Sequence, residues 1–123
     1  DEDNIGAARV VPDRTDAGAN TVTSSTLDEM LSGEDLSRLR FLKIDIEGYE
    51  LEALRGAVNT LNAFRPICLV EIRRDQLATF STTPEELFEY MADLGYRGHN
   101  ITEDGELVPT GPEMNANLVA FIA

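Results

Sequence analysis

The clearest pattern of apolar and polar positions lies in the middle of the chain. Residues 41–46 (FLKIDI) and 67–72 (ICLVEI) are mostly apolar runs of strand length, typical of strands that are covered on both faces. Between them, apolar residues recur at intervals of three and four, which predicts an amphipathic helix. These residues are Leu51, Leu54, Val58 and Leu61. Strand, helix and strand in close succession indicate a βαβ unit, so we expect two parallel neighbouring strands with a right-handed crossover.

The predicted central helix has recognisable boundaries. Its first turn is acidic, and Glu47 in that turn suits the positive end of the helix dipole. Gly56 lies in the middle of the helix, where we expect the backbone to approach the sheet closely. Arg65 and Pro66 end the helix, because proline cannot continue it.

The segment before this unit is less regular. Two short strands are expected at residues 9–11 and 20–23, on either side of a turn rich in aspartate and glycine. A helix should then begin near Thr26, since Thr26 and Glu29 have the spacing of a capping box. Gly33 ends or interrupts that helix.

A second helix after the βαβ unit is marked at both ends. Thr83 is the expected N-cap, Pro84 takes the first helical position, and Gly95 provides a left-handed stop. The predicted buried stripe of this helix consists of Leu87, Tyr90, Met91 and Leu94.

Three further strands are expected after this helix, at residues 96–101, 105–108 and 118–122. Asp104 and Gly105 form the turn between the first two. Strands that follow one another this closely pair antiparallel. The sequence therefore predicts an α/β fold in which parallel strands are followed by an antiparallel end.

Composition adds limits on function. A length of 123 residues and an apolar fraction of 42 % suit one small domain with one core. A net charge of −13, from 23 acidic against 10 basic residues, disfavours binding to nucleic acid or to an anionic membrane. No apolar run approaches the roughly 20 residues that cross a bilayer, so we expect a cytoplasmic protein. The lone Cys68 lies in an apolar run and is expected to be a buried, inert thiol.

Candidate chemistry gathers at the carboxyl ends of the two predicted parallel strands, where open α/β sheets bind ligands. Asp45 and Glu47 flank the end of the first strand, and Glu71 lies near the end of the second. Asp45 follows apolar strand residues, and an acid there is costly to bury unless it meets a partner or a polar cleft. Neighbouring parallel strands are about 4.8 Å apart, so we expect these acids to face one cleft. We therefore predict Asp45, Glu47 and Glu71 as the catalytic residues.

A set of short motifs in a fixed order resembles the FkbM family of methyltransferases. The motifs are TLD at 26–28, LKIDIEGYE at 42–50, LRGA at 54–57, RP at 65–66, VE at 70–71 and LGY at 94–96. The resemblance covers essentially the whole chain, and it is carried by the order of the set, with KIDIEG followed by RGA, rather than by any one motif.

The resemblance implies a Rossmann-like class I methyltransferase sheet, with residues 1–123 as a single partial domain that holds strands four to seven. It also implies S-adenosylmethionine as cofactor, with its methyl group transferred to a hydroxyl oxygen of a small molecule or glycan. Asp45 would lie beside the reactive end of the cofactor, with Glu47 and Glu71 toward the acceptor. The family's glycine-rich turn and acidic ribose-binding residue do not occur in this sequence. We therefore expect these residues alone to bind S-adenosylmethionine weakly or not at all.

Two other interpretations stay open at this point. A non-catalytic α/β module would bind a partner or self-associate, because a sheet without its other half exposes an edge strand and apolar surface. A magnesium-dependent enzyme would use Asp45, Glu47 and Glu71 as oxygen ligands. The chain begins at Asp1 without an initiator Met, which we interpret as a piece of a longer protein. A glycine-rich strand–turn–helix encoded just upstream would favour the enzyme.

Overall fold

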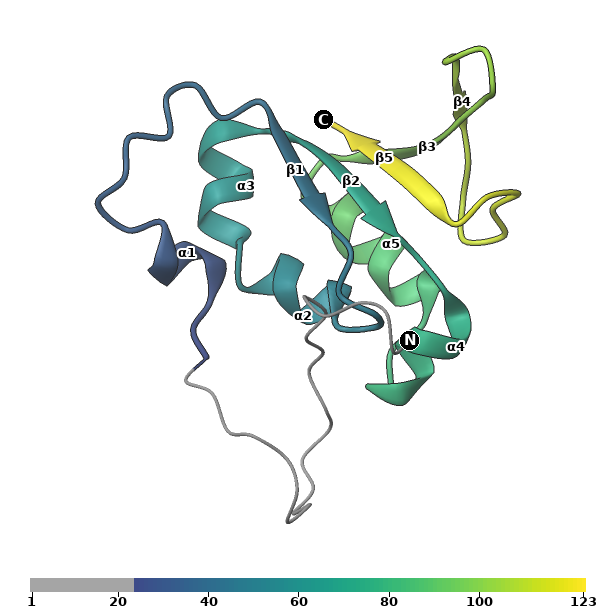
Figure 1. The fold of residues 1–123 in the computed structure, drawn as a ribbon, viewed down its shortest axis with the longest axis horizontal. Helices are drawn as coiled ribbons and strands as arrows, with labels where there is room; N and C mark the ends of the chain where they lie inside the picture. Colours follow the sequence, from purple (N-terminus) through teal and green to yellow (C-terminus); the bar gives the residue numbers. More distant parts are fainter. Residues whose placement is uncertain (1–23) are drawn as a thin grey trace, which may run out of the picture.

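In a computed structural model, which describes residues 24–123, five strands form one mixed sheet in the order β1-β2-β5-β3-β4 (Figure 1). The strands are β1 (Phe41–Ile44), β2 (Ile67–Glu71), β3 (Arg97–Ile101), β4 (Leu107–Pro109) and β5 (Leu118–Ile122). β1 and β2 pair parallel, and every other pair is antiparallel. The predicted parallel pair and antiparallel end are confirmed. The strands expected at 9–11 and 20–23 lie outside the described residues.

Five helices are described, and in Figure 1 those that follow β1 lie behind the sheet. They are α1 (Leu27–Met30), α2 (Glu50–Arg55), α3 (Val58–Phe64), α4 (Arg74–Thr79) and α5 (Pro84–Asp93). The core-facing side chains of β1, β2 and β5 alternate along each strand and pack against these helices to form the core. They include Ile44, Cys68, Val70, Val119 and Phe121. One face of the sheet is therefore packed as the apolar runs predict.

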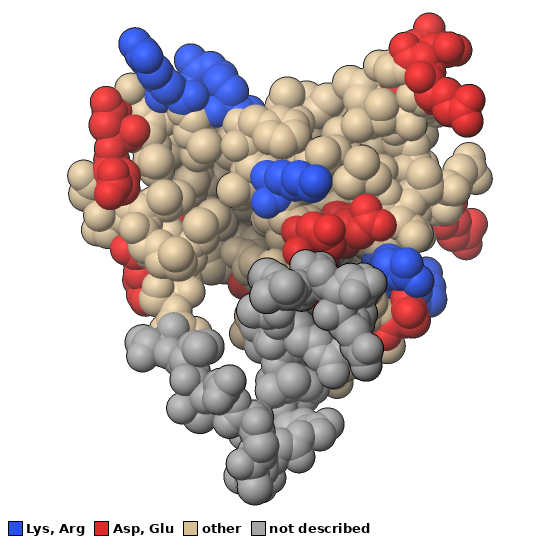
Figure 2. Space-filling view, viewed as in Figure 1, with Lys and Arg blue, Asp and Glu red and all other residues tan. Residues whose placement is uncertain are grey.

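The other face of the sheet has no helix over it among residues 24–123 (Figure 1). The strand register places Phe41, Ile67 and Ile101 on this face, and they are 52 %, 38 % and 41 % exposed. Figure 2 views this open face, where most visible side chains are uncharged and most of the charged ones lie toward the rim. The expectation that the strands at 41–46 and 67–72 are covered on both faces is therefore wrong for the part of the chain that is described.

The predicted central helix is two helices. α2 ends at Arg55, and α3 begins at Val58 after the break at Gly56. Asp28 of α1 provides the reason, because its carboxylate accepts hydrogen bonds from the backbone N–H groups of Asn59 (2.9 Å) and Thr60 (3.0 Å). A distant acid thereby satisfies the free amides of a second helix N-terminus.

Gly56 approaches α1 and not the sheet, contrary to the sequence expectation. A Cβ at this position would lie 3.1 Å from the Cβ of Thr26. The Gly56 carbonyl also accepts the backbone N–H of Asp28 at 2.9 Å. The start of α1 therefore packs against the break between α2 and α3.

The predicted starts of α1 and α5 and the predicted stop of α5 are confirmed, whereas α1 ends at Met30, before the predicted stop at Gly33. Thr26 and Glu29 form the reciprocal capping box at the start of α1. The Thr83 hydroxyl accepts the Glu86 N–H at 3.2 Å at the start of α5. Gly95 follows that helix with a φ of +88°. The helix α4 was not expected from the sequence.

The single thiol is buried, as predicted. Cys68 is fully enclosed in the core, and burial raises the pKa of its thiol to about 11. The neighbouring Tyr96 hydroxyl donates to the Pro66 carbonyl at 2.8 Å. The Arg65 guanidinium stacks over the Tyr96 ring at 4.6 Å from its centroid. Between residues 24 and 123, no helix combines the length and the apolar character that crossing a bilayer requires.

Candidate active site

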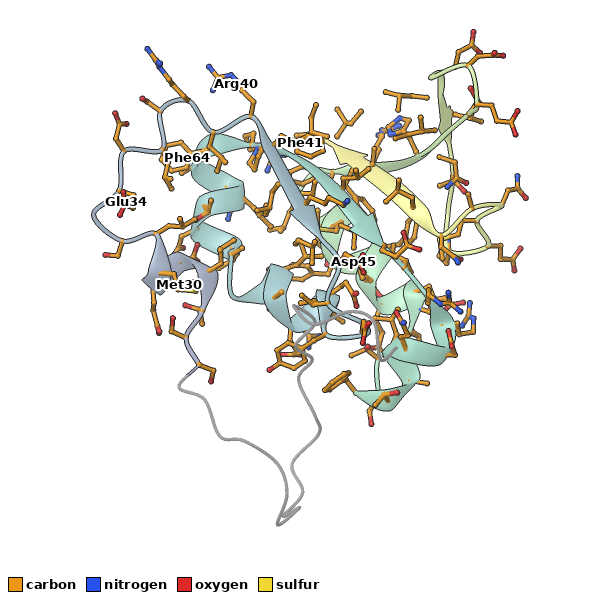
Figure 3. All side chains as sticks on the ribbon, in the orientation of Figure 1. Met30, Glu34, Arg40, Phe41, Asp45 and Phe64 are labelled. Atoms are coloured by element: carbon orange, nitrogen blue, oxygen red, sulfur yellow. The ribbon has the colours of Figure 1, made fainter. Side chains whose placement is uncertain are left out.

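Two of the predicted acids occupy matching positions at the ends of the parallel strands. Ile44 of β1 is in register with Val70 of β2, so Asp45 and Glu71 are the next positions along neighbouring strands. In-register residues of a parallel pair point to the same face, on strands about 4.8 Å apart. By this alternation both acids belong to the open face of the sheet. Figure 3 shows Asp45 at the tip of β1.

Glu47 lies in a turn and not in a helix. Its φ is +55°, and α2 begins only at Glu50. The expectation that Glu47 occupies the first turn of the helix is therefore wrong, and Glu50 and Glu52 are the first-turn acids. Glu47 is exposed at the same end of the sheet as Asp45.

Gly48 brings this turn into direct contact with α4. Its φ is +114°, and a Cβ there would lie 2.7 Å from the carbonyl carbon of Gln76 and closer still to its oxygen. Tyr49 beside it packs edge-on against Phe80, with ring centroids 5.1 Å apart. The β1–α2 loop, residues 45–49, therefore packs directly against α4 and the residue that follows it. Only glycine fits at position 48.

A buried carboxylate of α2 binds the backbone of the β1–α2 loop. Glu50 is 1 % exposed, and its two oxygens accept the N–H groups of Ile46 (3.2 Å) and Gly48 (2.9 Å). Burial raises the pKa of Glu50 and the charge of Asp45 adds to this effect, although the hydrogen bonds act in the opposite direction.

A cavity of about 700 Å³ lies beside β1, between its outer edge and the helices α1 and α2. The residues that line it are Ser24, Ser25, Thr26, Leu27, Glu29, Met30, Leu42, Lys43, Ile44, Asp45, Ile46, Tyr49, Glu52, Ala53 and Gly56. Asp45 belongs to this lining, whereas Glu47 and Glu71 do not. Three carboxylates against one ammonium group make the lining acidic, which suits a ligand that carries positive charge.

The arrangement gives no support to the magnesium interpretation. No group of three or more His, Cys, Asp or Glu side chains between residues 24 and 123 is placed to hold a metal ion. Asp45, Glu47 and Glu71 therefore share one end of the sheet without forming a ligand set for a cation.

Sequence reasoning missed Glu50 and the contact of the loop with Gln76. A signal for Glu50 was present, because it is spaced four, seven and eleven residues before Leu54, Ala57 and Leu61, on the apolar face of the helical pattern. An acid on such a face requires hydrogen-bond partners in the interior. No comparable signal identifies Gln76, since its backbone rather than its side chain makes the contact.

Comparison with known proteins identifies the family of this part of the chain. The sequence model of the methyltransferase FkbM domain matches residues 2–97, which is more than half of the chain and includes β1, β2 and the loop between β1 and α2. No curated protein and no solved structure matches the chain. The match over residues 2–97 is sufficient to conclude that the chain belongs to the FkbM methyltransferase family.

Proposed function

We propose that this chain takes part in S-adenosylmethionine-dependent transfer of a methyl group to a hydroxyl oxygen of a small molecule or glycan. In this proposal its strands are the C-terminal portion of a Rossmann-like class I methyltransferase sheet. Family membership supports methyl transfer. The single observation that carries the assignment to this site is the acidic cavity that Asp45 lines, at the carboxyl end of a parallel strand.

The residues present fit the charged end of this cofactor. S-adenosylmethionine supplies the methyl group from a cationic sulfonium when it is bound. The cavity beside β1 offers Asp45, Glu29 and Glu52 as negative charges, with apolar side chains and hydroxyl groups between them. A carboxylate at the strand end attracts positive charge and helps to orient it for in-line displacement.

The acceptor side of the reaction is assigned to the open face. An acceptor hydroxyl that takes up a methyl group would have to lose its proton to a base of the protein. A carboxylate oxygen of Glu71, at the matching position on β2, takes that proton as general base. Glu47 at the same end of the sheet contacts the acceptor. These roles remain proposals for Asp45, Glu47 and Glu71.

The test compares two ligands that differ by the methyl group and the positive charge. The ¹⁵N-labelled chain is titrated with S-adenosylmethionine and with S-adenosylhomocysteine, and amide shifts are followed because binding is expected to be weak. An exposed ion pair contributes about 0.2–1 kcal/mol, so the charged ligand should bind about 1.4–5-fold more tightly. Asp45→Asn should abolish this preference.

The matched control is Asp93→Asn, which removes the same charge from the exposed end of α5. It should retain the preference for the charged ligand. Amide shifts that lie only outside the cavity, or an unchanged preference in Asp45→Asn, would refute the assignment of this site.

A second proposal is self-association through the outer edge of β1. β1 is the end strand of the sheet, and no described strand pairs with its outer edge. Phe41 on this strand is more than half exposed (Figure 3). An unpaired strand edge next to an apolar face can pair with a strand of a second copy of the chain.

Sedimentation velocity over a range of protein concentrations tests this second proposal. Self-association should increase with added salt, because salt screens the repulsion between copies of charge −13. Phe41→Glu should weaken association. A monomer at every concentration and salt level would exclude it.

A further inference from the structure

Glu50 is the only acidic side chain that is buried among residues 24–123. It is the first residue of α2, and Leu51 and Leu54 of the same helix are completely enclosed. No buried polar side-chain atom in the described part of the chain lacks a hydrogen-bond partner. Burying a carboxylate in this place costs free energy, which its two hydrogen bonds offset. An apolar residue would pack here without that cost, so packing alone does not account for the carboxylate.

The two bonds reach the loop that carries the candidate acids. The acceptor atoms Oε1 and Oε2 bind the N–H groups of Ile46 and Gly48, which are the residues on either side of Glu47. Ile46 also follows Asp45 directly. Both Glu47 and Gly48 have positive φ angles, a backbone conformation that an unsupported chain seldom keeps.

We propose that Glu50 is a positioning residue, whose two carboxylate oxygens hold the β1–α2 loop so that Asp45 faces the cavity beside β1. The significance of that position rests on the proposed methyltransferase function. A carboxylate suits the task because it presents two acceptors to two donors. Glutamine has one acceptor oxygen, and its NH₂ group would face the second N–H without bonding to it.

The first measurement is amide hydrogen exchange by NMR in the 123-residue chain. In Glu50→Gln, exchange at Ile46 and Gly48 should accelerate at least tenfold relative to amides in β2 and β5. Glu89→Gln removes the same charge from an exposed position on α5 and should change neither amide. Unchanged protection of both loop amides in Glu50→Gln would overturn the proposal.

The second measurement is the preference for S-adenosylmethionine over S-adenosylhomocysteine. Glu50→Gln should reduce this ratio toward one although Asp45 is intact, and Glu89→Gln should retain the wild-type ratio. A purely structural role would lower the affinity for both ligands equally, leave their ratio unchanged and overturn the proposal. If the wild-type chain binds both ligands equally, the proposed function of Asp45 fails, whereas the exchange measurement still decides whether Glu50 holds the loop.

A third measurement needs no variant and applies if Glu50→Gln does not fold. The amide proton shifts of Ile46 and Gly48 in the wild-type chain should titrate together with the Glu50 carboxyl carbon, at a pH above that of an ordinary glutamate. Asp45 is the charged neighbour that acts on this group, so its own carboxyl carbon is followed in the same spectra. Loop amides that follow only Asp45, or neither acid, would contradict the assignment.

Discussion

Replacing Gly48 by alanine tests whether the β1–α2 loop depends on its close contact with α4. The substitution adds one methyl group at a φ of +114°, directed at the backbone of Gln76. A side chain at a positive φ costs about 1–2 kcal/mol. A clash with backbone adds about 1–3 kcal/mol, because backbone cannot move aside as a flexible side chain can.

The chain contains a control that separates these two costs. Gly105 also has a positive φ, of +82°, but nothing lies within 4 Å of a Cβ built there. Gly105→Ala should therefore cost only the backbone term, about 1–2 kcal/mol. The difference between the two variants isolates the contact with Gln76 and should be about 1–3 kcal/mol.

Urea unfolding followed by far-UV circular dichroism measures both variants, with the slope of free energy against urea checked for equality. Gly48→Ala should unfold at the lower urea concentration. It should also lose the preference for S-adenosylmethionine, since the loop that carries Asp45 would shift. If Gly48→Ala and Gly105→Ala are equally stable, the loop does not depend on α4 and the reasoning about this contact is wrong.

Two further predictions concern groups away from the loop. Burial acts to raise the pKa of Asp28, but hydrogen bonds from the Thr60 hydroxyl and from the backbone N–H groups of Asn59 and Thr60 outweigh it and lower that pKa. Asp28→Ala should therefore lower the free energy of unfolding by about 1–2 kcal/mol at pH 7. This loss should shrink as pH falls through the lowered pKa of Asp28. In the same urea titrations, Glu34→Ala on the exposed turn should show no such loss. Cys68, with its pKa raised to about 11, should react with iodoacetamide at pH 8 only as fast as the chain unfolds, and rapid labelling of the folded chain would contradict its burial.

The parts of the fold that the sequence predicted are those encoded by nearby residues. The capping box at Thr26 and the glycine stop at Gly95 act within one turn of helix, so their signals are local. The parallel pair was predictable because two apolar runs flank a helical pattern. The break between α2 and α3 was not, since Asp28 completes it from 31 residues away in the chain. No local periodicity contains that information.

Helix α4 was missed for a related reason. It has six residues and buries only Leu77, so it lacks a repeating apolar stripe. Other elements make contacts with it. Arg74 makes a bidentate ion pair with Glu85, at 2.7 and 3.0 Å, and the loop at Gly48 packs on Gln76. Such a helix is determined by tertiary contacts, which a single sequence does not display.

The sequence predicts where in the fold the candidate site lies, but only some of the residues that form it. The ends of parallel strands follow from the βαβ pattern, and Asp45 follows from its position after an apolar run. From the sequence, no role in the site is predicted for Glu50, because an acid at a helix N-terminus is already favoured by the helix dipole. Its function in the interior became evident only from the two amides that it binds.

The position of β5 has a consequence for how the protein is made. This strand follows β3 and β4 in sequence but lies between β2 and β3, where it pairs with residues 68–71 and with residues 97–100. During synthesis on the ribosome, β2 and β3 emerge well before the strand that joins them. A nascent chain that has not reached Leu118 therefore holds two unpaired strand edges, and this part of the sheet closes only after residues 118–122 are added.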